Sequence, residues 1–312
     1  MTTSVATPRH FLIDDDLTTG EVTAILDQAA QLKKDRFALR PLAGPKSVAV
    51  VFDKQSTRTR VSFEAGIAEL GGHPIIIDAR ASQLGRGETI EDTGRVLSRY
   101  VAAIVLRTFG HDRVETLAAN ATVPVINALT DLAHPCQWLA DLMTIRENRG
   151  DAAGQTITYV GDGNNVAHSI LLGGVLAGMH VRVASPAGYH PLPEIVQRAA
   201  AIGERTGGSA AVTDDPVAAS GGADVLYTDV WASMGQESES DERTVAFAGF
   251  QLDDRLVDVA RDDVMVLHCL PAHRGEEIAA SVIDGPHSFV FDQAENRLHA
   301  QKALLAFLLE HS

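Results

Sequence analysis

The sequence predicts an α/β protein of two doubly wound domains, each with a central parallel sheet flanked by helices. Three observations predict this class. Short β-branched, apolar runs alternate with longer helical patterns along almost the whole chain. At 312 residues, the chain is longer than one ordinary domain of roughly 100–200 residues. Polar residues follow several of the apolar runs, where open parallel sheets collect their ligands.

The predicted strands are short runs rich in apolar residues, as expected of parallel strands that are buried on both faces. In chain order they cover residues 47–52, 73–78, 102–108, 123–128, 156–162, 180–186, 223–230, 264–271 and 288–293. Helix-like stretches stand between them, for example over residues 59–70 and 88–101. The last segment, residues 294–312, has the apolar spacing of an amphipathic helix.

A polar, glycine-containing stretch, RENRGDAAGQT at residues 146–156, is the predicted boundary between the domains. We therefore expect a first domain over residues 1–148 and a second over residues 149–294. The C-terminal helix, residues 295–312, is expected to pack back on the first domain.

Composition indicates a soluble enzyme. The formal net charge of −15 argues against a general affinity for nucleic acid or acidic membranes, so any anion site must be a local cluster of arginines. Two cysteines are too few for a disulfide framework and lack the spacing of a zinc site. No signal peptide or run of roughly 18–20 apolar residues is present. We expect a cytoplasmic protein with no nucleic-acid or membrane partner.

The segment STRTR, residues 56–60, ends the first predicted strand and begins a helix. Ser56, Thr57, Arg58 and Thr59 there combine hydroxyls, a guanidinium and the N–H groups of a helix N-terminus, a combination that favours a phosphate dianion. The alternative is that the arginines make surface ion pairs on a solvated helix. Two arginines among hydroxyls at a strand end make that alternative less favoured.

Other predicted strands are also followed by side chains suited to chemistry. In chain order these are Arg107, His134 with Gln137, Asn164 with Asn165, Asp229 with Ser233 and Met234, and Cys269 with Arg274. Because the carboxyl ends of parallel strands share one edge of a sheet, we expect the residues of each domain to gather there.

Four of these motifs, in their order along the chain, resemble the aspartate/ornithine transcarbamoylase family. STRTR resembles its carbamoyl phosphate loop, HPCQ its HPxQ motif, DVWASMG its ornithine loop and HCLP its catalytic cysteine motif. The resemblance extends from about Phe11 to the C-terminal helix. It is closest to the members that use ornithine.

The resemblance implies a carbamoyl phosphate site. Arg107 and His134, with Thr59 assisting, would bind the carbamoyl oxygen, and Gln137 would hold the carbamoyl nitrogen. Arg297 would close on the ligand. The full implied set is Ser56, Thr57, Arg58, Thr59, Gln83, Arg107, His134, Gln137, Cys269, Leu270 and Arg297.

The resemblance also implies a homotrimer with shared active sites. The stretch SQLGRGETIEDTGRV, residues 82–96, matches a loop that reaches into a neighbouring subunit's site in the family. Gln83 would then contact the phosphate across an interface. Taken without the resemblance, this stretch is an ordinary surface loop.

For the second substrate, the resemblance implies that Asn165, Asp229, Ser233 and Met234 bind the α-amino acid end of ornithine. Asp229 has the plainest physical role, because a carboxylate at a strand end can pair with an α-ammonium group. The nearby GDGNNV is not a dinucleotide fingerprint, since Val166 replaces the third glycine. We expect neither an organic cofactor nor a metal.

Cys269 stands beside His268, which raises the hypothesis of a nucleophilic thiol. Adjacent residues on a strand point to opposite faces, so His268 is poorly placed to act as a base for Cys269. The resemblance makes Cys269, Arg107 and His134 the catalytic residues. Among them, Cys269 would assist the δ-amine of ornithine. A buried, inert cysteine is the alternative for Cys269. Cys136, inside HPCQ, is interpreted as a packing residue.

The predicted function is carbamoyl transfer from carbamoyl phosphate to the δ-amino group of L-ornithine, giving L-citrulline and phosphate in arginine biosynthesis. Substrates would bind in order, one on each domain, and closure would exclude water. Putrescine, N-acetylornithine and aspartate are alternative acceptors. A Cys/His hydrolase and a catalytically silent phosphate-binding or regulatory subunit are alternatives of other classes.

Overall fold

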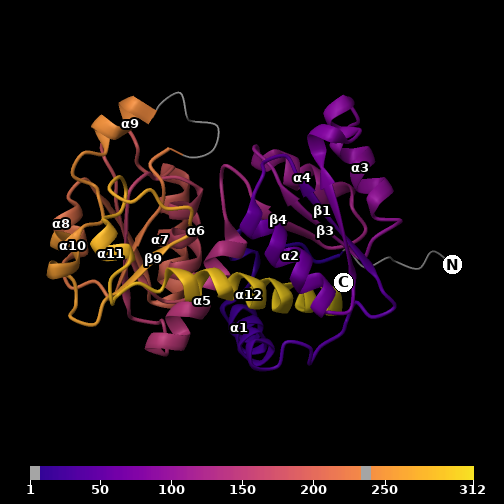
Figure 1. Ribbon diagram of the computed structural model, residues 1–312, viewed down its shortest axis with the longest axis horizontal. Helices are drawn as coiled ribbons and strands as arrows, with labels where there is room; N and C mark the ends of the chain where they lie inside the picture. The colour runs from indigo at the N-terminus through magenta and orange to yellow at the C-terminus, as the bar shows by residue number, and fades with distance from the viewer. Residues whose placement is uncertain (1–7, 233–239) are drawn as a thin grey trace. The chain divides into compact units, whose positions relative to one another are not determined.

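A computed structural model describes residues 8–232 and 240–312, with the side chains of residues 240 and 241 excluded (Figure 1). The chain forms two compact units. Unit 1 is Met1–Ala140 with Asn296–Ser312, and unit 2 is Asp141–Glu295. The chain passes from unit 1 to unit 2 within helix α5 (Pro135–Arg149) and returns within helix α12 (Val290–Glu310).

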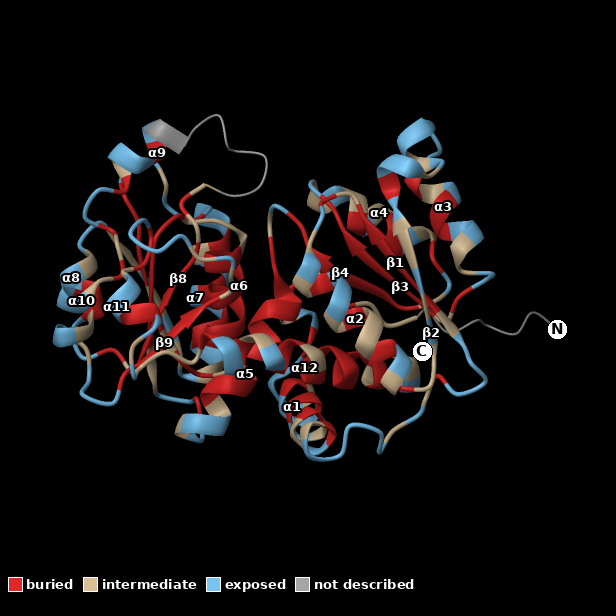
Figure 2. Ribbon diagram, in the orientation of Figure 1, coloured by how far each residue is buried: buried red, intermediate tan, exposed pale blue. Residues whose placement is uncertain are grey.

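Unit 1 contains a four-stranded parallel sheet in the order β2-β1-β3-β4. The strands are β1 (Ser47–Phe52), β2 (His73–Asp78), β3 (Ala103–Arg107) and β4 (Val125–Leu129). The helices are α1 (Thr19–Lys34), α2 (Thr57–Glu69), α3 (Ile90–Leu97) and α4 (His111–Asn120), with short 3-10 helices at Asp14–Asp16, Ala79–Ala81 and Leu84–Arg86. Strands β3 and β4 are buried throughout, whereas the edge strand β2 is half-exposed (Figure 2).

Strand alternation divides the core of unit 1 between the two faces of its sheet. Ala49 and Val51 of β1 point to the same face as Ile104 and Leu106 of β3, and this face is covered by apolar side chains that include Ile90 of α3 with Val114 and Leu117 of α4. Helix α2 packs on β1 and β2.

Unit 1 holds the C-terminal part of α12 through a buried lysine. Lys302 is 1% exposed, and its Nζ atom donates to Glu69 Oε2 at 2.7 Å and to the Arg36 carbonyl oxygen at 2.5 Å. Glu69 is the last residue of α2. Because removing one partner of a buried ion pair is strongly destabilising, this contact fixes α12 along α2.

Unit 2 contains a five-stranded parallel sheet in the order β7-β6-β5-β8-β9. The strands are β5 (Thr156–Val160), β6 (His180–Ala184), β7 (Ser209–Thr213), β8 (Val225–Thr228) and β9 (Met265–His268). The helices are α6 (Asn165–Leu176), α7 (Pro193–Thr206), α8 (Pro216–Ser220), α9 (Ser240–Ala246), α10 (Asp254–Val259) and α11 (Ala280–Ile283). Helix α6 is buried on all sides after its first residue, as its continuous apolar sequence predicts.

Each sheet reverses its strand order at one point, and this determines where ligands can bind. In unit 1 the chain runs from β1 to β2 on one side and then to β3 on the other, so the reversal lies between β1 and β3. In unit 2 the equivalent reversal lies between β5 and β8. STRTR, GDGNN and Asp229 follow β1, β5 and β8, and Arg107 is the last residue of β3.

The predicted fold class is confirmed: two parallel sheets are each flanked by helices. One strand assignment was wrong, and one strand was missed. Residues 288–293 do not form a strand, because the chain makes only a single bridge, from Ser288 to Val266, before α12 begins at Val290. Strand β7 was not predicted, because Ser-Ala-Ala-Val-Thr is poor in large apolar residues and forms a partly exposed edge.

Among the described helices, we found none with both the length and the apolar character needed to cross a membrane.

The turn between β5 and α6 is packed too closely for a side chain at Gly163. A Cβ atom there would lie 2.2 Å from the backbone nitrogen of Pro191 and 2.4 Å from the carbonyl carbon of His190. The Gly163 N–H also donates to the Tyr189 carbonyl oxygen at 2.8 Å. Glycine is required here by the close approach of two backbone segments.

Replacing Gly163 with alanine should therefore destabilise unit 2, whereas the same change at Gly20 should not destabilise unit 1. Overpacking against the backbone is expected to cost about 1–3 kcal/mol. Gly20 lies in α1, and a Cβ atom added there would have no neighbour within 4 Å, so Gly20→Ala should be neutral or slightly stabilising. Thermal unfolding of both variants checks this, and equal midpoints for the two would contradict it.

Candidate active site

The segment after β1 forms a hydroxyl-rich helix start. Ser56 is the N-cap of α2, and its Oγ atom accepts from the Thr59 N–H at 3.3 Å and donates to Thr59 Oγ1 at 3.0 Å. Thr57 is exposed and Arg58 is half-buried. The Arg58 guanidinium makes no hydrogen bond or ion pair within the described part of the chain, so this cation is available to a ligand.

The hydroxyl of Thr59 is the point on which two arginines converge. Arg107 Nη1, from the end of β3, and Arg297 Nη2, from α12, each donate to Thr59 Oγ1 at 3.3 Å. Arg297 Nη1 also donates to Gln137 Oε1 at 2.5 Å. All four side chains are buried, with Thr59 only 1% exposed. The arrangement places two guanidinium charges around a neutral hydroxyl in a water-poor environment.

His134 is buried within the positive field of Arg107 and Arg297. It precedes α5 and is 5% exposed. Burial of the imidazole, followed by the positive charges of Arg297 and Arg107, holds the pKa of His134 well below its usual value. A lowered pKa keeps the ring neutral at pH 7, and a neutral imidazole can donate through one ring nitrogen without adding charge.

Cys136, between His134 and Gln137, has the properties of a packing residue. It is fully buried and donates from Sγ to the Asn127 carbonyl oxygen at 3.4 Å. Burial raises the pKa of the Cys136 thiol to about 12. The thiol is therefore protonated and unreactive near neutral pH.

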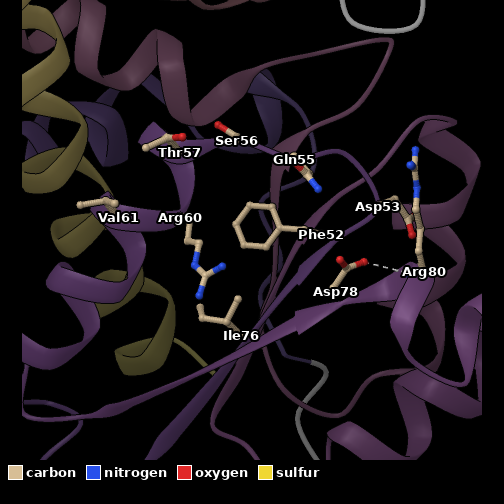
Figure 3. A pocket seen from close by; sticks show the side chains of 10 residues that line it. All are labelled: Phe52, Asp53, Gln55, Ser56, Thr57, Arg60, Val61, Ile76, Asp78 and Arg80. Carbon is tan, nitrogen blue, oxygen red and sulfur yellow. Dashed lines mark hydrogen bonds between the residues drawn. The ribbon is translucent and has the colours of Figure 1, made fainter.

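A pocket of about 290 Å³ adjoins the STRTR segment (Figure 3). Ser56 and Thr57 form one wall, and Asp78, at the end of the edge strand β2, and Arg80, just after it, form the opposite one. Exposed Val61 contributes apolar surface. Gln83 lies in the following loop with an exposed side chain, and no hydrogen bond joins it to Ser56 or Arg58 in the described residues.

Lys54, just before STRTR, was not singled out from the sequence. It is 8% exposed, its Nζ atom lies 2.5 Å from Asp131 Oδ1, and it stands 4.3 Å from the centre of the Phe109 ring. Its position just after the buried strand β1 could have marked it as a candidate site residue. The contact ties the loop after β1 to the segment after β4.

In unit 2, the carboxylate of Asp229 is held by two neutral donors. Cys269 Sγ donates to Asp229 Oδ1 at 2.9 Å, and Asn164 Nδ2 donates to Asp229 Oδ2 at 3.0 Å. Asn164 is also the N-cap of α6, where its Oδ1 atom accepts from the N–H groups of Val166 and Ala167. The sequence indicated Asn165, which is the first, half-buried residue of α6, and missed the contact made by Asn164.

Two buried tyrosines report a negative field in this part of unit 2. Burial, followed by the charges of Asp229 and Asp162, raises the pKa of Tyr159 well above its usual value. Burial and then the charge of Asp141 do the same for the pKa of Tyr227, with smaller contributions from Cys269 and Asp229. The field favours a cationic ligand, whereas the arginine group of unit 1 favours an anionic one.

His268 does not serve Cys269, as strand alternation predicts. His268 Nδ1 accepts from the Leu270 N–H at 2.9 Å, so Nε2 carries the proton that faces Glu277 Oε1 at 3.1 Å. Leu270 has a φ of 57°, a backbone conformation that residues other than glycine rarely adopt. His268 and Glu277 thus shape the loop that carries Cys269 instead of activating its thiol.

The remaining residues singled out from the sequence are Arg274, Ser233 and Met234. Arg274 forms a bidentate ion pair with exposed Asp284, at 2.9 and 2.7 Å, and contacts no predicted site residue among those described. Ser233 and Met234 lie outside the described residues.

Among the described residues, two groups of side chains have potential metal-ligand atoms within 4.8 Å of one another. One is Asp229, His268 and Cys269, and the other is His273, Glu276 and Glu277. Hydrogen bonds within and between these groups already connect Cys269 to Asp229 and His268 to Glu277. These hydrogen bonds explain why the side chains of the first group lie close together without requiring a metal.

Comparison with known proteins places this geometry in context. Residues 9–147 match the model of the carbamoyl-P binding domain of aspartate/ornithine carbamoyltransferase, and residues 153–308 match that of its Asp/Orn binding domain. The chain is 69% identical to an ornithine carbamoyltransferase of Acidothermus cellulolyticus, over 97% of each chain. It is 64% identical to one from Parafrankia sp., over 98% of each. The solved ornithine carbamoyltransferase of Pyrococcus furiosus is 51% identical, with full coverage of both chains and a TM-score of 0.93.

The two thiols should differ sharply in reactivity. Because the pKa of Cys136 is raised to about 12, its thiol stays protonated as the pH rises through 8 and 9 and should resist alkylation in the folded protein. Cys269 is only partly buried and should be alkylated first. Mass spectrometry of peptides after timed iodoacetamide treatment distinguishes the sites. Faster modification of Cys136 than of Cys269 in folded protein would contradict the assignment, and Cys269→Ala should remove the fast phase.

Proposed function

The chain belongs to the aspartate/ornithine carbamoyltransferase family, and we propose that it transfers the carbamoyl group of carbamoyl phosphate to the δ-amino group of L-ornithine, giving L-citrulline and phosphate. The bond between the δ-nitrogen and the carbamoyl carbon forms as the bond from that carbon to the phosphate oxygen breaks. The amine loses one proton in the process. The phosphate is already a good leaving group, so positioning and electrostatics supply much of the acceleration.

The observation that carries the proposal is the convergence of Arg107 and Arg297 on the Thr59 hydroxyl, beside a neutral His134. Few ligands other than a compact, highly charged anion benefit from such a group. The half-buried guanidinium of Arg58 stands at the start of the same helix. Together they support a phosphate-bearing substrate in unit 1.

We assign the carbamoyl phosphate contacts within unit 1 by function. The hydroxyls of Ser56, Thr57 and Thr59 and the guanidinium of Arg58 bind the phosphate. Arg107 and His134 donate to the carbonyl oxygen, which gains negative charge as the carbon becomes tetrahedral. Each well-placed donor of this kind is worth about 3 kcal/mol in other enzymes.

Gln137 and Arg297 complete the unit 1 contribution. The Gln137 carbonyl oxygen, which accepts from Arg297, is the natural partner for the carbamoyl NH₂ group. When a substrate phosphate enters, Arg297 can exchange its contact with Thr59 for a stronger, charge-assisted one. We therefore expect Arg297 to contact carbamoyl phosphate directly.

Ornithine binding is assigned to unit 2. Asp229 offers a buried carboxylate to the α-ammonium group, with Asn165 and, outside the described residues, Ser233 and Met234 completing the amino-acid site. The δ-amine has a reference pKa of about 10.4, so it must lose its proton before attack. Cys269 and Leu270, on the loop after β9, lie at the end of the sheet where that step would take place.

The negative field of unit 2 separates the acceptors. Aspartate carries a second carboxylate, which the charges that raise the pKa of Tyr159 would repel. Putrescine has no α-carboxylate, and N-acetylornithine has no α-ammonium group to pair with Asp229. Ornithine is the acceptor that fits best, so it remains the proposal.

We further propose a homotrimer with shared active sites. The edge strand β2 is half-exposed, and Ile75 on it and Val61 on α2 are exposed at 36% and 56%. An exposed apolar edge of this kind is normally covered in the functional assembly. The pocket lined by Ile76, Val61 and residues of STRTR can receive the loop that carries Gln83 from a neighbouring chain.

Two broader assignments complete the proposal. The reaction forms citrulline, and we place it in arginine biosynthesis. A cytoplasmic location is supported by the two cysteines, because both are free thiols and neither forms a disulfide.

Citrulline production should require Arg58. With carbamoyl phosphate, the wild type should form citrulline and phosphate with ornithine but not with aspartate, putrescine or N-acetylornithine. Arg58→Ala removes a charge-assisted contact to the phosphate, so kcat/KM should fall roughly 100-fold or more. Arg40→Ala, at an exposed arginine of the same unit that lies outside the proposed site, is the matched control and should stay near wild type. Turnover with another amine would overturn the acceptor, and unimpaired Arg58→Ala would overturn the phosphate site.

Shared sites predict complementation between two inactive variants. Arg58→Ala chains and Gln83→Ala chains should each have little activity, but chains mixed by unfolding and refolding together should regain about a quarter of wild-type activity, the fraction of sites with both residues intact. Light scattering should give the mass of a trimer. No recovery in mixed, correctly assembled protein would show that each chain supplies its own Gln83.

A further inference from the structure

The buried side chain of Arg243, in α9, joins two segments of unit 2 that flank Asp229. Its Nη1 atom donates to Asp162 Oδ2 and to the Trp231 carbonyl oxygen, both at 2.8 Å. Arg243 is 6% exposed and Asp162 7%. A guanidinium bound in this way inside the protein is charge-compensated and directionally fixed.

One aromatic ring lies over the Arg243 guanidinium and belongs to a cluster of three. The guanidinium carbon of Arg243 lies 5.1 Å from the centre of the Tyr189 ring. The Phe247 ring contacts the rings of both Tyr189 and Trp231, at centroid distances of 4.9 and 5.8 Å. The rings leave the ion pair little room to rearrange, so its geometry is transmitted to the backbone on both sides.

One anchored segment leads to Asn164, which binds the Asp229 carboxylate, and the other leads to Asp229 itself. Asp162 begins the turn after β5, where its carbonyl oxygen accepts from the Asn164 N–H at 2.7 Å. Asn164 in turn donates from Nδ2 to Asp229 Oδ2 at 3.0 Å. Trp231 follows Asp229 by two residues. Arg243 therefore constrains the chain after β5 and the chain after β8 at the switch point of the sheet.

We propose that Arg243 is a positioning residue for the amino-acid acceptor, acting through Asp162 and Trp231 on Asn164 and Asp229. This inference rests on the proposed function and extends it to a residue outside the substrate-binding set. All of the contacts lie in unit 2, whereas the carbamoyl phosphate residues other than Cys269 and Leu270 lie in unit 1. Loss of Arg243 should therefore weaken ornithine binding selectively.

The first test is a comparison of Michaelis constants in the full-length protein. Arg243→Met should raise the KM for ornithine roughly tenfold or more while the KM for carbamoyl phosphate stays within about twofold. Arg243→Lys keeps the charge but loses the planar fork, so it should give a smaller rise. The lysine variant also answers the question if Arg243→Met fails to fold.

Arg149→Met is the matched control for loss of an ion pair in unit 2. Arg149 Nη2 lies 2.9 Å from Asp224 Oδ1, and Asp224 immediately precedes β8, at the end of the strand opposite to Asp229. Removing this pair should lower the thermal midpoint, as Arg243→Met should, but leave the KM for ornithine unchanged. A merely structural role for Arg243 would make the two variants alike.

A second comparison tests whether Arg243 acts through Asp162. If it does, adding Asp162→Asn to Arg243→Met should raise the KM for ornithine by less than the product of the two single effects.

Each outcome supports or overturns the inference. An active wild type with unchanged ornithine KM in both Arg243 variants, or an equal rise in both Michaelis constants, would overturn the positioning role alone. Equal KM effects in Arg149→Met would do the same. A wild type that forms no citrulline would overturn the proposed function together with this inference.

Discussion

The hydroxyl of Thr59 is the contact on which the unit 1 site depends. It accepts hydrogen bonds from Arg107 and Arg297, whose positions in the chain lie far apart, and it sits on the first turn of a helix capped by Ser56. Burying two guanidinium groups around one neutral oxygen is unfavourable unless an anion or a strong dipole compensates them. Burial, together with the same charges, lowers the pKa of His134 and so gives the site a neutral donor. Anion affinity and carbonyl polarisation therefore follow from one arrangement.

Unit 2 inverts that electrostatic pattern on the same kind of sheet. Asp229 replaces the arginines as the central charge. Burial, with the nearby negative charges second, raises the pKa values of Tyr159 and Tyr227. In both units the residues lie at the point where the strand order reverses, between β1 and β3 or between β5 and β8. One architectural rule thus gives an anion site and a cation site in a single chain, as a reaction between a phosphorylated carbonyl compound and a diamino acid requires.

Much of this arrangement could be predicted because parallel strands place the residues that follow them at one edge. STRTR, Arg107 and Asp229 were found in this way, and most strands were recognised from their apolar composition. The contact from Arg297 to Thr59 spans 238 residues, so no local pattern contains it and only the family resemblance pointed to it. The contact of Asn164 with Asp229 was missed because the two roles of this side chain, helix cap and partner of Asp229, are visible only in three dimensions. Edge strand β7 was missed because an exposed edge needs few large apolar residues.

The most direct test of the account is the binding of phosphonoacetamide, a carbamoyl phosphate analogue in which a methylene group replaces the labile oxygen, measured by isothermal titration calorimetry. Thr59→Val removes the hydroxyl that orients both arginines while keeping the side-chain volume nearly unchanged. The account predicts one site per chain in the wild type and an affinity lower by roughly tenfold or more in Thr59→Val. Equal affinities, or no binding to the wild type, would contradict the claim that Thr59, Arg107 and Arg297 form the anion site.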